Sequence, residues 1–350
     1  MWNAVVDAAQ SMQSDVEDDS EREGGGGIHL GFSEEPEAPR YLLRHFFPSK
    51  IGGQPAWLDP IRLPTGDNQT KCCGCGGPLS FLLQLYAPIN LKDECFHRTL
   101  YVFTCTKEEC LRKNLGVTVL RCQLRRKNPY YGYHPCEDEQ EQPVLAPGQK
   151  CEPPQTGFLG PWAESELVTD EEPRDAGEAQ EGESNESELD RLARQYGGMV
   201  VGRGGGEGED MALGEEGQDD EGDIDLNEMD ENGDEEWAKF RKRLSRAPSQ
   251  CVRYCGDPEG GEPEDGEDRV PLWPSSSNLP GEIPKCELCG EPRKFEFQVL
   301  PQVLYYAGVD SGLPDDLDFT TIAVYTCTCD VWGGQGSAYA REFAWTHCNG

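Results

Sequence analysis

Paired cysteines at short spacing are the residues of this sequence that are best suited to chemistry. Cys72-x-x-Cys75 is followed, after 29 residues, by the pair Cys105 and Cys110. Two such pairs, brought together by a β-hairpin, supply the tetrahedral set of thiolates that zinc prefers. Gly76 suits the tight turn in which the backbone curls around a metal. The spacing predicts a structural zinc site at these four cysteines, and the alternative is four buried free thiols.

A second set of cysteines has a related spacing. Cys286-x-x-Cys289 precedes Cys327-x-Cys329, with 37 residues between the pairs. A single residue between two ligands of one tetrahedral ion is a tight fit. The candidates for the fourth ligand are therefore Cys329, Cys348 and His347. We assign Cys329, and we expect one or two zinc ions in closed sites that stabilise the fold and leave no open position for catalysis.

The remaining cysteines and the other common motifs point away from catalysis. Cys73 lies inside the first knuckle and is not assigned as a ligand. The sequence has no H-E-x-x-H, G-x-S-x-G or P-loop motif, so an enzyme is not expected. We expect isolated thiols at the six cysteines without metal-type spacing, which are Cys95, Cys122, Cys136, Cys151, Cys251 and Cys255.

Three further positions carry structural predictions. Gly52-Gly53 must form a turn, because consecutive glycines suit backbone conformations that other residues avoid. Trp57 is expected to pack in the core against the first β unit. His97 lies in a strand-like run, where a packed or surface histidine is a more common finding than a catalytic one.

The composition restricts the kind of partner. The 350 residues include 66 Asp and Glu against 31 Lys and Arg, a formal net charge of −35. This charge disfavours direct binding to nucleic acid or to an anionic membrane, and it favours a basic partner. Neither a signal peptide nor a transmembrane run is expected. In the reducing compartment that this implies, clustered cysteines bind metal more often than they form disulfides.

Most of the negative charge lies in one segment. Residues 137–236 contain 33 Asp and Glu and five Lys and Arg, a net charge of −28. Low hydrophobicity with high net charge predicts disorder. We therefore assign 137–236 as an acidic disordered linker and 1–27 as a disordered tail. Two apolar, cysteine-bearing blocks remain, 28–136 and 237–350, and each is long enough for a small core.

The two blocks resemble each other. CCGCGGPLSFLLQL at 72–85 aligns with CELCGEPRKFEFQV at 286–299, and six of the fourteen positions are identical. Downstream, YVFTC at 101–105 parallels AVYTC at 323–327. A repeat of this kind indicates one structural unit that is used twice.

Local patterns around the cysteines are typical of strands. The short apolar or alternating runs are 79–86, 100–105, 117–124, 295–300, 320–327 and 342–345. A helix is predicted over 234–248, where acidic residues come first, basic residues come last, and Trp237, Phe240 and Leu244 form an apolar stripe. The predicted fold class is mainly β with some α (α+β). It consists of two related β-rich zinc-knuckle modules, packed together and joined by a long acidic disordered linker.

These motifs are similar to those of the programmed cell death protein 2 family, which includes its "2-like" relatives and the fungal 20S-rRNA-accumulation protein four. The resemblance identifies 28–136 as the N-terminal β-rich zinc-knuckle module and 237–350 as the family's C-terminal domain. The matching segments, in chain order, are LGF, FPSKIGGQPAWL, CCGCGGPLSFLLQLYAP, FHRTLYVFTC, RCQLRRKNPYY, WAKFRKRLSRAPSQCVRY, PLWPSS, IPKCELCGEPRKFEFQVLPQVL, TIAVYTC and YAREFAW.

Two departures from the family pattern are visible. Some members carry a MYND zinc finger after the N-terminal block, and nothing after Tyr133 has the dense Cys/His pattern that this finger needs. The chain therefore resembles the MYND-less branch. The family also usually separates its last two cysteines by several residues, whereas here only Thr328 lies between Cys327 and Cys329.

The resemblance implies a function. It predicts a dedicated, co-translational chaperone that binds a newly made basic small-subunit ribosomal protein, universal small-subunit protein five. Such a chaperone supports 40S subunit assembly and 20S pre-rRNA maturation. We expect a cytoplasmic monomer that shuttles to the nucleus and makes no direct contact with nucleic acid or membrane. The alternative is a zinc-binding regulatory scaffold in transcription, cell-cycle or apoptosis control.

Overall fold

The computed structural model describes six stretches of the chain and two single residues. These are 27–132, 158, 160, 162–173, 235–256, 269–309, 317–331 and 338–348. The predictions for the tail 1–27 and for most of the linker 137–236 therefore lie outside the described residues. Within the described stretches, no helix is both long and apolar enough to cross a membrane.

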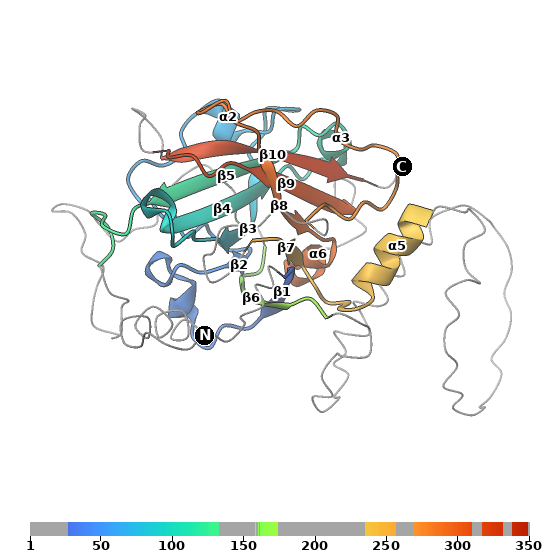
Figure 1. The fold of residues 1–350 in the computed structure, drawn as a ribbon, viewed down its shortest axis with the longest axis horizontal. Helices are drawn as coiled ribbons and strands as arrows, with labels where there is room; N and C mark the ends of the chain where they lie inside the picture. Colours follow the sequence, from blue (N-terminus) through green and yellow to red (C-terminus); the bar gives the residue numbers. More distant parts are fainter. Residues whose placement is uncertain are drawn as a thin grey trace, which may run out of the picture.

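The described strands form a closed antiparallel barrel (Figure 1). Around the ring the order is β1-β6-β2-β3-β4-β5-β10-β9-β8-β7, and β7 pairs with β1 to close it. The expected mainly β fold is confirmed, and the two related modules share one barrel. The strands are β1 His29–Glu34, β2 Lys50–Ile51, β3 Ser80–Tyr86, β4 His97–Thr104, β5 Val117–Leu124, β6 Ser165–Glu171, β7 Val252–Tyr254, β8 Lys294–Val299, β9 Thr321–Thr326 and β10 Tyr339–His347.

Short helices connect the strands. The helix predicted over 234–248 is confirmed as α5, Glu235–Leu244, in which Trp237 stacks on the buried Phe240 with ring centroids 5.7 Å apart. In Figure 1 this helix extends from the side of the barrel. The other helices are η1 Pro39–Leu42, η2 Arg44–Phe46, α2 Asp67–Thr70, η3 Asp93–Cys95, α3 Glu108–Arg112 and α6 Gln302–Tyr306.

The sequence repeat is also a structural repeat. β2 to β5 of the first half correspond in order and pairing to β7 to β10 of the second half. The register of β3 against β4 shifts between Phe81 and Leu83, and that of β8 against β9 shifts between Phe295 and Phe297. These bulges fall at aligned positions of the repeat, so one bent hairpin is used twice. The halves join along two seams, β5–β10 and β1–β7.

Residues 165–171 correct the predicted linker. This segment forms β6, which pairs with β1 on one side and with β2 on the other. The linker prediction was wrong here because glutamates dominate the local composition, and only Leu167 of the strand is buried in the core. A strand held between two neighbours needs few apolar side chains of its own, because the pairing supplies its backbone partners.

The predicted turn at Gly52-Gly53 is confirmed. Both residues have left-handed backbone, with φ of 63° and 64°. The amide of Gly53 donates to the carbonyl of Trp162 at 3.1 Å, so the turn also holds the segment that leads into β6. A side chain at Gly52 would collide with that segment, because its Cβ would lie 1.8 Å from the carbonyl oxygen of Ala163.

Replacing Gly52 by alanine is therefore expected to lower the free energy of unfolding by about 2–4 kcal/mol, through backbone strain and the collision together. Urea titration would measure the loss. Gly308→Ala is the matched control, since Gly308 has φ of 71° and nothing within 4 Å of its added Cβ. It should cost about 1 kcal/mol. Equal losses in the two variants would show that the close contact between Gly52 and Ala163 has no effect on the free energy of unfolding.

Apolar side chains fill the barrel and also cover the outside of its first half. The interior cluster includes Leu83 of β3, Val102 of β4, Phe297 of β8 and Val324 of β9. Outside the first half, Trp57 is buried against the rings of Tyr101, Phe103 and Tyr339, with centroids 5.0, 5.8 and 5.0 Å away. The prediction that Trp57 packs in the core is therefore confirmed.

Candidate metal centres

The first cluster consists of Cys72, Cys75, Cys105 and Cys110. The four sulfur atoms all lie within 4.8 Å of one another. The first two come from the turn before β3, the third directly follows β4, and the fourth lies in α3. Gly76 has φ of 70°, which lets its amide turn back to the carbonyl of Cys72 at 2.8 Å. The predicted knuckle is thus formed by the hairpin that the spacing implied.

Backbone amides surround the sulfur atoms of the first cluster. The amide of Gly74 donates to the sulfur of Cys72 at 3.3 Å, and that of Lys107 donates to Cys105 at 3.5 Å. A backbone hydrogen bond from Gly77 lowers the pKa of Cys75 to about 7, whereas burial raises the pKa of Cys110 to about 11. A divalent cation would favour the thiolate form of all four, since metal binding releases thiol protons.

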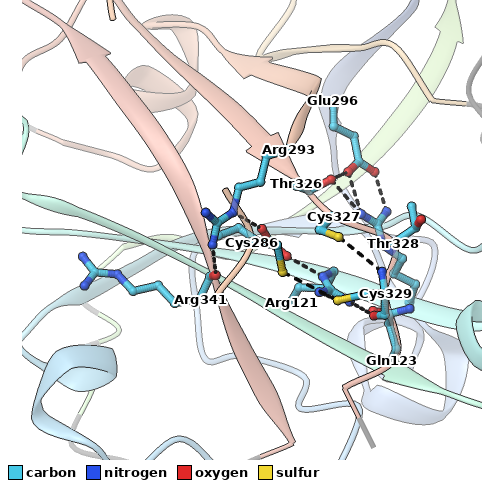
Figure 2. A network of polar contacts seen from close by, with 12 residues as sticks. Arg121, Gln123, Cys286, Arg293, Glu296, Thr326, Cys327, Thr328, Cys329 and Arg341 are labelled. Atoms are coloured by element: carbon cyan, nitrogen blue, oxygen red, sulfur yellow. Dashed lines mark hydrogen bonds and ion pairs between the residues drawn. The ribbon is translucent and has the colours of Figure 1, made fainter. Parts of the chain in front are cut away.

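The second cluster consists of Cys286, Cys289, Cys327 and Cys329, whose sulfur atoms also lie within 4.8 Å of one another. The sulfur atoms of Cys286 and Cys329 are 3.6 Å apart, as are those of Cys289 and Cys327. The short spacing of the last two is accommodated by a tight turn in which the amide of Cys329 donates to the sulfur of Cys327 at 3.4 Å. Figure 2 shows three of these cysteines converging.

The structure separates the three candidates for the fourth position of this cluster. Cys329 lies with the other three cysteines, as assigned from the sequence. Cys348 lies apart and places its sulfur 3.8 Å from the carbonyl of Asp318. His347 ends β10 and belongs to neither group of ligand atoms within the described residues.

A buried ion triad of Arg121, Glu342 and Arg293 links the two loops of the second cluster. Figure 2 labels its two arginines. Arg121, from β5 of the first half, donates to the carbonyl of Cys329 at 2.7 Å and to Glu342 at 2.5 Å. Glu342 also accepts from Arg293 at 2.8 Å, and Arg293 donates to the carbonyl of Lys285 at 2.6 Å. Both loops are therefore hydrogen-bonded to arginines that share the Glu342 carboxylate. One of these arginines, Arg121, belongs to the first half of the chain.

The buried pair of Arg98 and Glu296 lies beside the triad. Arg98 donates to Glu296 at 2.6 Å and to Thr326 at 3.0 Å. Burial acts to raise the pKa of Glu296, but the charge and hydrogen bonds of Arg98 outweigh it and lower that pKa. The pair stays ionised and, like the triad, joins the two halves. Sequence reasoning missed all five charged residues, since their partners are between 49 and 221 residues apart.

The other cysteines lie apart from both clusters. Cys95, Cys122, Cys251 and Cys255 are buried free thiols that belong to no candidate metal group in the described part of the chain, as predicted. Cys136 and Cys151 lie outside the described residues. Cys73 is exposed beside the first cluster, and its sulfur accepts a hydrogen bond from Arg341 at 3.2 Å.

His97 is a packed residue, as its sequence context indicated. Its ring stacks on Phe47 with centroids 4.3 Å apart, and its Nδ1 lies 2.9 Å from the hydroxyl of Tyr86. Burial, assisted by the charge of Arg126, lowers the pKa of His97 to about 3. The imidazole is therefore neutral in the folded protein over the whole physiological range.

This burial predicts an acid-sensitive stability. Below the ordinary histidine pKa, His97 is protonated in the unfolded chain but stays neutral in the folded protein. The free energy of unfolding therefore decreases as the pH falls. Between pH 7 and pH 5 this group alone should remove about 2 kcal/mol from the free energy of unfolding. Urea titrations of the wild type and of His97→Phe would isolate the effect. A variant that kept the whole pH dependence would contradict it.

Each cluster falls within a separate family match. Residues 27–138 match the N-terminal domain of programmed cell death protein 2, and residues 234–348 match its C-terminal putative domain. The protein named programmed cell death protein 2 from Mus musculus is 32% identical over 377 residues, which cover 91% of this chain and 96% of that protein. This chain belongs to the programmed cell death protein 2 family.

More distant members of the family match as well. Programmed cell death protein 2-like from Mus musculus is 25% identical over 347 residues, covering 84% of this chain and 88% of that protein. Probable 20S rRNA accumulation protein 4 from Schizosaccharomyces pombe is 34% identical over 96 residues, covering 26% and 22% of the two chains. No solved structure matches this one.

The donor sets of this family member suit zinc. Four sulfur atoms at mutual distances below 4.8 Å, drawn from two turns, correspond to the closed tetrahedral sites in which zinc has a structural role. Such an ion, when bound, would replace four separate thiols by one crosslink between a turn and the end of a hairpin. Each half of the barrel has its own cluster of this kind.

Proposed function

We propose that this protein is a dedicated, co-translational chaperone of a newly made basic small-subunit ribosomal protein, universal small-subunit protein five. In this role it supports 40S subunit assembly and 20S pre-rRNA maturation. The observation that carries the proposal is the match to a relative whose name is probable 20S rRNA accumulation protein 4. The match is confined to 96 residues, so it supports a role in ribosome formation before it supports a particular client.

Charge supports a basic client. The net charge is −35, and −28 of it lies in residues 137–236. A ribosomal protein that has not yet met its RNA exposes basic segments, and an acidic partner can shield them and compete with incorrect RNA contacts. The same charge disfavours direct nucleic-acid binding by the chaperone itself. We further propose a monomer that is not an enzyme, cytoplasmic with shuttling to the nucleus, and of the MYND-less branch.

In this proposal both clusters hold structural zinc. The metal ions would fix the hairpins of the barrel and would take no part in a reaction, because each site is closed by four protein ligands. The chaperone role then depends on the surface of the barrel and on the acidic residues of 137–236. Metal loss would abolish client binding only indirectly, through loss of the fold.

The identity of the client can be tested by isolating the tagged protein, together with translating ribosomes, from cells. The proposal expects enrichment of nascent chains of one basic small-subunit protein, and accumulation of 20S pre-rRNA when the chaperone is depleted. The regulatory scaffold is the alternative. Enrichment of transcription, cell-cycle or apoptosis factors without any ribosomal nascent chain, together with normal 20S pre-rRNA, would reject the chaperone and favour the scaffold.

A further inference from the structure

A cavity of about 370 Å³ lies on the side of the barrel where α3, α5 and the end of β10 come together (Figure 1). Its volume falls in the usual range of ligand pockets, roughly 300–1,000 Å³. Its walls include Arg112 of α3, Trp237 of α5, Pro274 and Asn278 of the loop that precedes the second cluster, and His347 of β10. Neither cysteine cluster contributes to the lining, so the cavity is separate from the metal centres.

His347 carries a buried polar group that the fold leaves unused. The residue is 6% exposed, and neither of its ring nitrogens makes a hydrogen bond of normal geometry within the described stretches. Burial lowers the pKa of His347, and the backbone of Ser277 acts to a smaller extent in the opposite direction, so the ring is neutral. A neutral imidazole has one donor and one acceptor nitrogen. Because buried polar groups are rarely left unpaired, His347 marks a place for a ligand that can donate and accept.

The repeat in the fold identifies the counterpart of His347 in the first half. Cys122 of β5 pairs with Thr99 of β4, and His347 of β10 pairs with Thr321 of β9. Thr99 and Thr321 each stand two residues before the aligned motifs YVFTC and AVYTC. Cys122 and His347 therefore occupy equivalent positions at the ends of equivalent hairpins.

The loops that cross these positions are equivalent as well. In the first half, the side chain of Gln84 accepts at 2.8 Å from the amide of the residue before Trp57. In the second half, the side chain of Gln298, its counterpart in the repeat, accepts at 3.0 Å from the amide of the residue before Trp273. The residues that follow the two tryptophans therefore correspond to each other.

In the first half, two tyrosines of the chain itself fill the place between this loop and the strand. Tyr130 is buried in the same apolar cluster as Cys122, and Tyr131 packs against that cluster. Tyr131 also donates its hydroxyl to the carbonyl of Leu58, the residue after the tryptophan, at 2.7 Å. The first place thus recognises a tyrosine by its ring and by its hydroxyl.

The second half has the cavity at the same place. Pro274, the counterpart of Leu58, and His347 both line it, and no described residue fills it as the two tyrosines fill the first place. A phenolic hydroxyl can both donate and accept, which matches the two ring nitrogens of a neutral histidine. Trp237 adds an aromatic wall, against which a second ring can pack favourably. The lining therefore suits a tyrosine side chain.

We propose that this cavity binds a tyrosine side chain of a partner protein, in the position that Tyr130 and Tyr131 hold in the first half. The phenol ring would pack against Trp237, and its hydroxyl would form a hydrogen bond with His347. The site is formed by described residues of the barrel and α5, so the inference is independent of the proposed client. It would give the protein a contact that recognises one side chain by shape and hydrogen bonding, without relying on charge.

A synthetic peptide with the sequence RRKNPYYG, residues 125–132, is a suitable probe because it contains the tyrosines that fill the first half. Added to the full chain labelled with fluorotryptophan, it should shift the fluorine NMR resonance of Trp237 and leave that of Trp57 unchanged. The peptide with phenylalanine in place of both tyrosines should bind about tenfold more weakly, because it leaves His347 unpaired. Equal affinities of the two peptides, which have the same charge, would overturn the proposal, as would an unshifted Trp237 resonance.

A matched pair of histidine variants tests the role of His347. His347→Leu should remove the preference for the tyrosine peptide over the phenylalanine peptide, because the hydroxyl loses its partner. His45→Leu replaces a partly exposed histidine outside the cavity and should keep the preference. A preference that survives in His347→Leu would contradict the assignment. Trp237→Leu is a second variant, at the opposite wall, which should weaken both peptides alike, and unchanged affinities in it would also reject the site.

A photo-crosslinker in place of Ser277, an exposed residue of the lining, separates the possible occupants. It should react with the tyrosine peptide. Reaction with Trp2, Tyr133 or Tyr196 of the same chain that the peptide does not displace would show that the chain fills its own cavity, and would overturn the proposal. Crosslinks between two copies of the chain that the peptide does not displace would overturn it in the same way.

Discussion

Replacing Cys105 by serine is expected to remove one metal ion per chain and to destabilise the barrel more than any other single change considered. Cys105 is buried at the end of β4 and shares the first cluster with a turn and a helix. Structural zinc sites contribute about 10–16 kcal/mol of apparent binding free energy to small domains. Losing one of four ligands should forfeit at least about 5 kcal/mol of this, a large fraction of the stability of an ordinary protein.

The measurement is metal content by mass spectrometry together with urea unfolding. Cys73→Ser is a close control, because Cys73 lies between two ligands of the same knuckle but is exposed and outside the cluster. It should keep the metal content and lose less than about 1 kcal/mol. If both variants retained metal and stability alike, the first cluster would be a group of free thiols.

Glu342→Gln is expected to cost about 3–5 kcal/mol of unfolding free energy, the usual result of breaking a buried ion pair from one side. The Glu342 side chain is 0% exposed, and it is the shared acceptor of Arg121 and Arg293. Glutamine keeps the size and removes the charge, so both guanidinium groups would stay buried without a counter-ion. The second cluster should also weaken, since these arginines hold its two loops. Removal of supporting groups around metal sites typically lowers affinity about 10–100-fold.

Thermal or urea unfolding and a zinc competition titration would measure the two effects. Glu108→Gln removes the same kind of charge from a pair with Arg112 in which both side chains are nearly half exposed. That control should cost no more than about 0.5 kcal/mol and leave metal affinity unaltered. If Glu342→Gln lowered the unfolding free energy and the metal affinity as little as the control does, the triad would not stabilise the barrel or the second cluster.

Local sequence signals predicted much of the fold. Val117–Leu124 forms β5 over the same residues as the predicted run, because alternating apolar residues between turns leave little choice. The cysteine spacing gave the membership of both clusters, since a knuckle and a hairpin end converge by local geometry alone. Even the tight Cys327-x-Cys329 pair fits, because one backbone amide folds the chain around a sulfur.

Long-range features could not be predicted in the same way. Leu167, Val168 and Thr169 favour a strand, but they are too few among acidic residues to predict one. β6 is stabilised by two neighbours that lie far away in the sequence. The closure of the ring by β1 and β7 joins residues more than 200 positions apart. The sequence does not distinguish Arg121 and Glu342 from ordinary surface charges, because their burial and pairing depend on contact between the two halves. Each of these depends on tertiary pairing, which composition and periodicity do not encode.

The closed ring also limits how the proposed client could be held. Among the described strands each one has a neighbour on both sides, so an extended client has little free edge along the barrel wall. The ends of the barrel remain, where the loops of one half face the short strands of the other. At one end the partly buried Trp162 packs against the interior cluster, and at the other a cavity of about 290 Å³ lies beside the second cluster.

Native mass spectrometry of the full chain, purified gently from cells that make ribosomes, would detect bound metal and a bound client together. We expect two zinc ions per chain and, on part of the population, one retained basic small-subunit ribosomal protein. A chain that carries no metal and no basic partner would contradict both the metal centres and the chaperone role.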